Sequence, residues 1–338
     1  RLEAIHYYVH DLERSRRFYT GLCDLPEVAR SHGDVDRIGK QTAAVFDTGH
    51  VNIVVSAPVG DGGRASRFLR NHPDGVGTLI FEVEDAELAF RLLDKRGGTP
   101  IQDVQRAQDD HGEIRYFSIT SPLGDTTLRF VERRGYRGMF PGFTPVDRAS
   151  QAAKNAFGIG PVDHVTCNFQ TMSPALLWME HVLGFERYWD VEFHTQDVSP
   201  ENESGSGLRS VVMRDPVSGV KFANNEPRRP SFTTSQINVF NRDHRGDGVQ
   251  HVALIVDDLI ESVRGLRARG VEFMATPGSY YDMLAENMER RGVGKIDETL
   301  KELGKLGILV HRQGAGRYML HIFLKDRHPL SGATETGP

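Results

Sequence analysis

The chain has 338 residues, enough for roughly two domains, and its 38% apolar and 26% charged residues are typical of an ordinary globular protein. The formal net charge is only −5, and Lys and Arg are scattered among the acids, which argues against nucleic-acid or membrane-surface binding and leaves small molecules as the expected partners. The chain has only two cysteines, which argues against a disulfide scaffold. It has no apolar span long enough for a membrane protein and no signal sequence of a secreted one. We therefore expect a soluble cytoplasmic protein.

The predicted elements, taken in chain order, form repeating modules. The chain opens on the strand-like run RLEAIHYYVH at residues 1–10 and passes into an amphipathic helix. A second module starts at Asp74 with a buried strand, an acidic helix cap and an amphipathic helix, and continues through strand-like segments such as GTPIQDV at 98–104. Each unit is typical of a β-α-β-β-β module, and two modules make a domain.

The same pattern returns in the second half of the chain. The segment from Asp74 aligns without gaps on the segment from Asp247, at a constant offset of 173 residues, the difference between positions 247 and 74. A looser copy relates the residues near His6 to those near His164. This self-similarity predicts an α+β fold of duplicated β-α-β-β-β modules, arranged as two domains that each have an open barrel-like mixed sheet and outer helices.

A stretch rich in Gly, Pro and small residues, YRGMFPGFTPVDRASQAAKNAFGIGP, lies between the two halves at residues 136–161. This composition is typical of a linker, so we place the domains at residues 1–150 and 151–338. A helical insertion at residues 280–310 interrupts only the fourth module, and such an insertion commonly covers a pocket.

Comparison of equivalent positions indicates which half carries chemistry. His251 in the second half corresponds to Thr78 in the first. His164 is matched by His6, so a metal site built from the first strands of both modules keeps two imidazoles only in the C-terminal half. A lone histidine is more often hydrogen-bonded than a metal ligand, and His6 is therefore given no role. A pair of histidines at equivalent strand positions favours metal binding.

Nearly the whole chain resembles the 4-hydroxyphenylpyruvate dioxygenases, which have the vicinal-oxygen-chelate architecture. The matching segments, in the family's order, are DHVTCN, GLRSVVM, FANNEP, SQI, GVQHVAL, RGVEF, YY, ELGKLGILV and MLHIF. The resemblance implies Fe(II) held inside a half-open C-terminal sheet by His164, His251 and a glutamate, a set that leaves three metal positions for a 2-oxo acid and dioxygen. It also implies the conversion of 4-hydroxyphenylpyruvate and O2 to homogentisate and CO2, a step of tyrosine catabolism.

The resemblance further implies a substrate pocket. The family's hydrogen-bonding positions are occupied by Ser210, Asn225, Gln236 and Gln250. Phe323 matches an aromatic residue that stacks on the substrate ring, for which core packing is the alternative. His321 stands where the family usually has Gln, and Ala223 where many members have Pro, so the pocket departs from the family at these two positions.

The third metal ligand is the larger departure. In the first half, Arg129 stands at the place where the family's second domain carries its glutamate. The chain ends on RHPLSGATETGP, which contains Gly and Pro and has no alternating apolar pattern, so we expect a loop there. Glu335 is its only acid and is the less favoured candidate. The simpler expectation is a glutamate on a last strand beyond Pro338.

Three functions follow from these observations. The leading hypothesis is an Fe(II)-dependent 4-hydroxyphenylpyruvate dioxygenase. A 4-hydroxymandelate synthase or a related 2-oxo acid dioxygenase is the first alternative, because it shares the fold and the substrate and the pocket departures leave its product open. A catalytically silent small-molecule binding protein is the alternative of another class, suggested by the missing glutamate. We expect a homo-oligomer, a dimer or tetramer, in which the N-terminal domain serves assembly.

Overall fold

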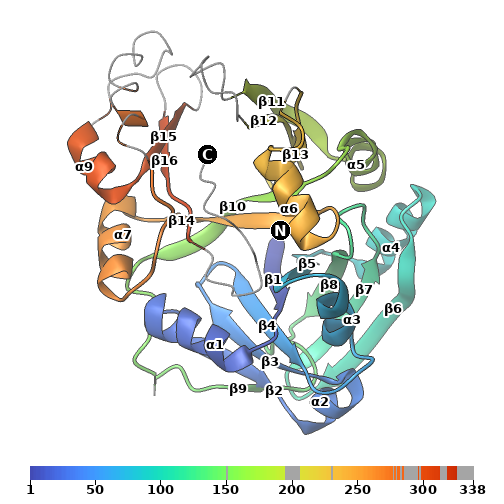
Figure 1. Ribbon diagram of the computed structural model, residues 1–338. Helices are drawn as coiled ribbons and strands as arrows, with labels where there is room; N and C mark the ends of the chain where they lie inside the picture. Colours follow the sequence, from blue (N-terminus) through green and yellow to red (C-terminus); the bar gives the residue numbers. More distant parts are fainter. Residues whose placement is uncertain are drawn as a thin grey trace.

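The computed structural model describes residues 1–149, 151–194, 206–229, 231–276, 278, 280–281, 284, 296, 298–312 and 318–325. Two mixed β-sheets dominate these residues, and helices pack around them (Figure 1). The sheets, the helices and the repeated modules confirm the predicted α+β class. Among the described residues, no helix is both long enough and apolar enough to cross a membrane.

The first sheet has nine strands. In spatial order they are β6 (Pro100–Asp109), β7 (Gly112–Ile119), β8 (Thr127–Arg134), β5 (Gly75–Glu82), β1 (Leu2–Tyr8), β4 (Asn52–Pro58), β3 (Gln41–Asp47), β2 (Glu27–Ser31) and β9 (Phe143–Pro145). The second sheet has the order β11 (Glu186–His194), β12 (Gly207–Arg214), β13 (Lys221–Pro227), β10 (Ile159–Asn168) and β14 (Gly248–Val256). A separate hairpin is made by β15 (Leu309–Arg312) and β16 (Tyr318–His321).

The helices lie outside the sheets. They are α1 (Leu12–Arg16), α2 (Gly33–Gly39), α3 (Arg64–Asn71), α4 (Ala86–Lys95), α5 (Ser173–Trp178), α6 (Gln236–His244), α7 (Leu259–Ala268) and α9 (Leu300–Leu306). The π-helical turns η1 (Arg17–Leu22) and η2 (Met179–Leu183) extend α1 and α5. Within the predicted insertion, α9 is helical, whereas residues 285–295 lie outside the described residues.

Acidic caps begin the repeated helices, as the sequence predicts. The Asp85 side chain accepts a hydrogen bond from the Leu88 backbone N–H at the start of α4. The Asp258 side chain does the same for Glu261 at the start of α7. Each carboxylate satisfies a backbone donor that the first helical turn leaves without an intrahelical partner.

The segment predicted to be a linker is partly structured. Residues Phe143–Pro145 form β9, which pairs antiparallel with β2 at the edge of the first sheet. The Gln151 side chain accepts from the Glu27 backbone N–H at 2.8 Å and donates to the Glu27 carbonyl at 2.6 Å. A proline is tolerated in β9 because this strand is short and lies at the edge of the sheet, where the N–H group that proline lacks is not needed for strand pairing.

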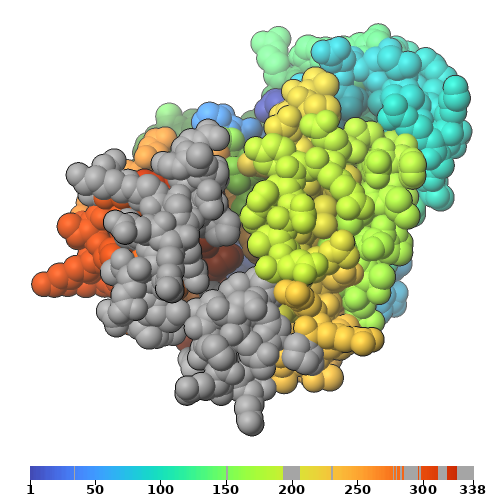
Figure 2. Space-filling view, turned by 90° about the horizontal axis from the view of Figure 1, so that it is seen from above, coloured from blue at the N-terminus to red at the C-terminus, as the bar shows by residue number. Residues whose placement is uncertain are grey.

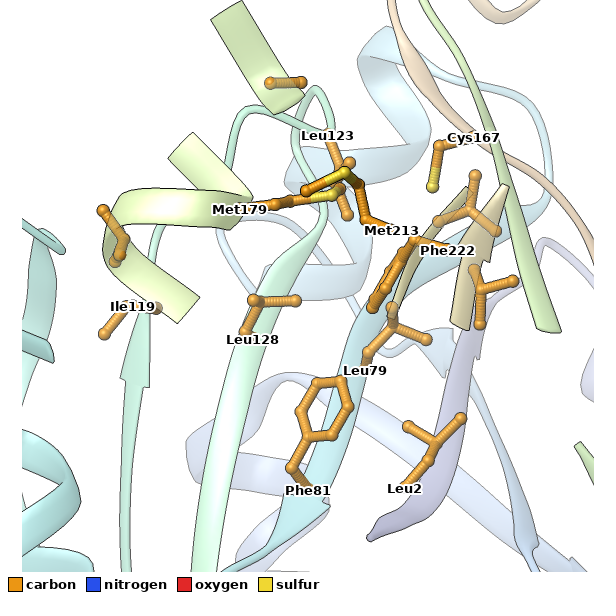
Figure 3. Close-up of a cluster of buried hydrophobic side chains, with 14 of the residues drawn as sticks. Leu2, Leu79, Phe81, Ile119, Leu123, Leu128, Cys167, Met179, Met213 and Phe222 are labelled. Atoms are coloured by element: carbon orange, nitrogen blue, oxygen red, sulfur yellow. The ribbon is translucent and has the colours of Figure 1, made fainter. Parts of the chain in front are cut away.

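One face of each sheet packs into a shared hydrophobic core. We call this the packed face; it carries Ile5 and Leu79 in the first sheet, and Val165 and Cys167 in the second. Figure 3 shows side chains of the two sheets and η2 meeting in this core. The labelled residues from the first half are Leu2, Leu79, Phe81, Ile119, Leu123 and Leu128, and those from the second half are Cys167, Met179, Met213 and Phe222.

The opposite face, which we call the inner face, differs between the halves. In the first sheet it carries Ala4 and Ile80, which are buried in a second apolar cluster. In the second sheet it carries His164, Thr166 and Asn168, because successive residues of a strand alternate between faces. The inner face of the first sheet also carries polar side chains farther along, where His6 pairs with Thr78.

Candidate metal centre

His164 and His251 lie together on the inner face of the second sheet. His164 is on β10, and His251 on the antiparallel neighbour β14, opposite Thr166. Because Thr166 is two residues from His164, the two histidines are diagonal neighbours on one face. Their ring centroids are 5.7 Å apart and the rings are inclined by 74°. The structure thus brings together the two predicted metal ligands.

A β-bulge precedes each histidine. Val162 pairs with Leu254 and His164 with Ala253, so Asp163 is an extra residue on β10. The register shifts again on β14 between the partners of Thr166 and Cys167. A bulge bends the strand and redirects side chains, and bulges are frequent next to active sites.

The extra residues of both bulges contact the imidazoles that follow them. Asp163 Oδ2 lies 2.7 Å from His164 Nδ1, and Gln250 Oε1 contacts His251 Nδ1. Carboxylate and amide oxygens only accept hydrogen bonds, so both Nδ1 atoms are donors. His251 Nε2 is then an acceptor, and the Thr166 hydroxyl lies 3.0 Å from it. A neutral imidazole with an available Nε2 lone pair is the form that binds metals.

Burial and neighbouring groups favour the neutral form of His251. Burial, together with the nearby rings of His164 and His321, lowers the pKa of His251 to about 3, so His251 is neutral at pH 7. Asp163 also accepts from Lys221 Nζ at 2.8 Å. The hydrogen bond from His164, together with Lys221, holds the pKa of Asp163 at about 2 against the opposing effect of burial.

Three polar side chains continue the inner face across neighbouring strands. Ser210 on β12 is opposite Asn225 on β13, which in turn pairs with Asn168 on β10. Asn225 Nδ2 donates to Asn168 Oδ1 at 3.1 Å. Ser210 and Asn225 were predicted as pocket residues, whereas Asn168 and Thr166 were missed. The alternation of His164, Thr166 and Asn168 along β10 was the signal that could have found them.

Aromatic residues close to the histidines come from the end of β16 and from the residues that follow it. The Phe323 ring meets His251 edge to face, with centroids 5.3 Å apart, and meets His321 in the same way at 5.5 Å. Phe323 lies beside the predicted ligand His251, and His321 lies beside Phe323. Gln236 begins α6, where its backbone N–H donates to Ser206 Oγ at 3.2 Å.

The surface is hollowed beside this part of the second sheet. Figure 2 shows a hollow next to the yellow-green residues of β11 and β12, with dark red atoms of the chain near β16 at its floor. Two other surface pockets lie elsewhere. One, of about 240 Å³, is lined by Pro26, Arg148, Ala149, Ala153 and Lys154. The other, of about 480 Å³, is lined by Arg1, Glu82, Val83, Glu84, Glu132, Arg133, Arg134 and Ser218.

The third ligand of the predicted triad is not placed. In the part of the chain that the structure describes, no three His, Cys, Asp or Glu residues are grouped so that they could hold a metal ion. Glu335 lies outside the described residues. Two imidazoles whose Nδ1 atoms are engaged by neighbouring oxygens fit the nitrogen donors of a non-haem iron site, and one carboxylate would complete the set.

The strand register corrects the match of His6 with His164. Ala4 pairs with Ile80 as His164 pairs with Ala253, so Ala4 is the counterpart of His164. His6 pairs with Thr78 and is instead the counterpart of Thr166. The sequence alone favours pairing histidine with histidine, because the positions of the bulges are defined only by the pairing of the strands.

The first half therefore has no imidazole at either ligand position. His6 Nε2 is hydrogen-bonded to Ser56 Oγ at 2.7 Å, which agrees with a structural role. Arg129, on the strand next to β5, donates to Ser118 Oγ at 3.1 Å, and its guanidinium lies 5.4 Å from the centre of the Tyr116 ring. A fixed cation in this position opposes metal binding in the first half.

Known proteins are similar to this chain in sequence and in fold. A match to the Glyoxalase/Bleomycin resistance protein/Dioxygenase superfamily covers residues 1–127 and 162–288. The chain is 32% identical to the 4-hydroxyphenylpyruvate dioxygenase of Dictyostelium discoideum, over 96% of this chain and 88% of that protein. It is 35% identical to the enzyme of that name from Caenorhabditis elegans, over 81% of this chain and 70% of that protein.

A solved structure has the same fold. A mutant of 4-hydroxymandelate synthase from Streptomyces coelicolor superposes with a TM-score of 0.79 and 23% identity, covering 98% of this chain and 89% of that one. The matched superfamily residues lie in both halves, and the relatives align over most of the chain. The chain therefore belongs to the Glyoxalase/Bleomycin resistance protein/Dioxygenase superfamily and, within it, to the family of the 4-hydroxyphenylpyruvate dioxygenases.

Proposed function

We propose that this chain converts 4-hydroxyphenylpyruvate and O2 to homogentisate and CO2, and that Fe(II) is its metal. The observation that carries the proposal is the pair of imidazoles on one inner face, His164 and His251, each with Nδ1 engaged by a neighbouring oxygen. The names of the relatives support the reaction and the substrate.

The donor set supports iron as the metal. Two histidines and one carboxylate are the ligands that non-haem Fe(II) oxygenases use on one face of the metal. The third ligand is proposed to be a glutamate, and Glu335, which lies outside the described residues, is not favoured for this role. Bound Fe(II) would supply the activation of O2 and the binding of the 2-oxo acid group.

The chain's own side chains are proposed to bind and orient the substrate. Ser210 and Asn225 lie in one row of the inner face and offer hydrogen bonds to its polar groups. Gln236 and Gln250 are proposed for the same role, and His321 adds a ring nitrogen at the site. Phe323 lies against His251, where an aromatic ring can pack on the substrate ring and exclude water.

Product analysis with anaerobically loaded protein tests the proposal. The purified protein, reconstituted with Fe(II), is given 4-hydroxyphenylpyruvate and O2, and oxygen uptake, CO2 and the aromatic product are measured. Homogentisate in step with oxygen uptake is the expected result, and His251→Ala should abolish it. 4-Hydroxymandelate as the product would replace the proposed reaction by that of a synthase. The absence of both iron binding and turnover would favour a silent binding protein.

The assembly and the location complete the proposal. A homo-oligomer, either a dimer or a tetramer, is proposed and is tested by size-exclusion chromatography with light scattering. A cytoplasmic location is proposed because Cys23 and Cys167 are both free and buried, which suits a reducing compartment.

A further inference from the structure

Asp163 links His164 to a lysine on a neighbouring strand. One carboxylate oxygen, Oδ2, lies 2.7 Å from His164 Nδ1, and the other, Oδ1, accepts from Lys221 Nζ at 2.8 Å. Lys221 is the first residue of β13, the parallel neighbour of β10. The carboxylate is therefore held at both oxygens, by groups from two different strands.

The bulge at Asp163 makes this contact possible. Successive side chains of a regular strand point to opposite faces, so a residue cannot normally reach the ring of its immediate neighbour. Between Val162 and His164, however, β10 advances by two residues while β14 advances by one. The extra residue leaves the alternation, and its carboxylate reaches the ring edge of His164.

The contact determines which nitrogen of His164 is available. A carboxylate accepts hydrogen bonds and donates none, so the proton of the neutral ring is on Nδ1 and the lone pair is on Nε2. Histidines that bind metals commonly donate their other ring N–H to a carboxylate, which fixes the tautomer and the ring orientation.

We propose that Asp163 is a positioning residue of the metal centre: held by Lys221, it keeps His164 in the Nδ1–H tautomer and directs Nε2 toward the metal. This inference rests on the proposed function, because it takes His164 as an iron ligand. Asp163 acts through His164 and touches neither substrate nor the reacting atoms.

The first half offers a matched control. Between Leu2 and Ala4 the register of β1 against β5 shifts in the same way, so Glu3 is the bulged counterpart of Asp163. Glu3 is buried and accepts from Arg133 Nε at 2.7 Å. The residue that follows it is Ala4 instead of a histidine. Glu3→Gln therefore removes a buried bulge carboxylate without touching a ligand.

The tautomer is measured first, in the metal-free protein. Nitrogen-15 NMR at pH 8.5, where an ordinary imidazole is neutral, distinguishes a protonated from an unprotonated Nε2, and His164→Gln assigns the signals. We expect an unprotonated Nε2 at His164 in the wild type and in Glu3→Gln. In Asp163→Asn we expect a shift of the population toward protonated Nε2. A protonated Nε2 in the wild type would overturn the proposal, whether or not the protein binds iron.

Metal affinity is measured second, by anaerobic competition for Fe(II) with a chromogenic chelator. We expect Asp163→Asn to weaken binding about 10- to 100-fold, as is typical for loss of a ligand's outer partner. Asp163→Glu should recover part of the loss, and Glu3→Gln should bind like the wild type. Binding by Asp163→Asn within twofold of the wild type would contradict the proposal, as would an equal loss in Glu3→Gln. Wild-type protein without His251-dependent iron binding would instead refute the proposed function, and the NMR result would still decide the role of Asp163.

Discussion

One hydrogen bond on the inner face connects Thr166 with a proposed metal ligand. Thr166 is buried, and its hydroxyl is the hydrogen-bond partner of His251 Nε2, the nitrogen proposed to bind iron. In the metal-free protein the Thr166 hydroxyl is hydrogen-bonded to the lone pair of His251 Nε2, and a bound metal would take the place of that hydroxyl. If His251 binds iron as proposed, metal binding and folding should be coupled at this residue.

Thr166→Val should reveal that coupling. Valine keeps the shape but leaves His251 Nε2 without its donor, so the metal-free protein should lose about 1–2 kcal/mol of unfolding free energy. Fe(II) supplies the missing partner, and the stabilisation on adding it should be larger than in the wild type. Denaturant unfolding with and without Fe(II) measures both quantities. An unchanged metal-free stability would show that the hydrogen bond contributes nothing.

His6 should make the protein sensitive to acid. Burial, together with the charges of Arg129 and Arg64, lowers the pKa of His6 to about 3. The unfolded chain takes up a proton near pH 6.5 while the folded chain does not, so stability present above pH 6.5 is lost as the pH falls toward 3. For one such group the loss between pH 7 and pH 5 is about 2 kcal/mol.

His6→Gln removes this group and should flatten the pH dependence. The difference in unfolding free energy between the wild type and His6→Gln should change by about 2 kcal/mol from pH 7 to pH 5, in favour of the variant at low pH. Urea unfolding across that range measures it. A constant difference would mean that His6 takes up its proton in the folded protein.

At the scale of elements, the duplication predicted more than local propensity did. The segments that start at Asp74 and Asp247 each contain a strand followed by a capped helix, as predicted. Such elements can be predicted because helix caps and strand alternation depend on residues that are close together in the sequence. The bulges at Glu3 and Asp163 could not be predicted, since they arise from pairing between strands distant in the sequence. For the same reason His6 was matched with the wrong residue, and Asp163 was not recognised as a partner of His164.

The two acidic caps should be energetically alike. Asp85 and Asp258 accept from the backbone N–H three residues on, at 2.8 and 3.0 Å. Asp85→Ala and Asp258→Ala should each lower the unfolding free energy by about 1 kcal/mol, because each leaves one helix donor without its cap. Chemical denaturation measures both. A loss in only one variant would show that the repeated helices differ in their dependence on the cap.

At the scale of the molecule, the shared core joins the two halves. The packed faces of both sheets contribute to one apolar cluster, with Leu79 and Phe117 from the first and Met213 and Phe222 from the second fully buried. Removing either half would expose the packed face of the other. The two halves should therefore unfold together.

Cooperative unfolding is testable because both tryptophans, Trp178 and Trp189, are in the second half. Tryptophan fluorescence reports on that half, whereas far-ultraviolet circular dichroism reports on both, and the two unfolding curves should coincide. Phe222→Ala should shift both curves together, at a cost of about 3–5 kcal/mol. A circular dichroism curve with two steps would show that the halves unfold separately.

The shared core also bears on how the protein is made. A ribosome completes the first sheet before the strands of the second exist, so the apolar side chains of Leu79, Phe81 and Phe117 have no partner sheet during that interval. The newly made first half is then an aggregation-prone intermediate until the strands β10 to β14 have been synthesised and have packed against it. The surface that stabilises the finished molecule therefore favours aggregation while the chain is being made.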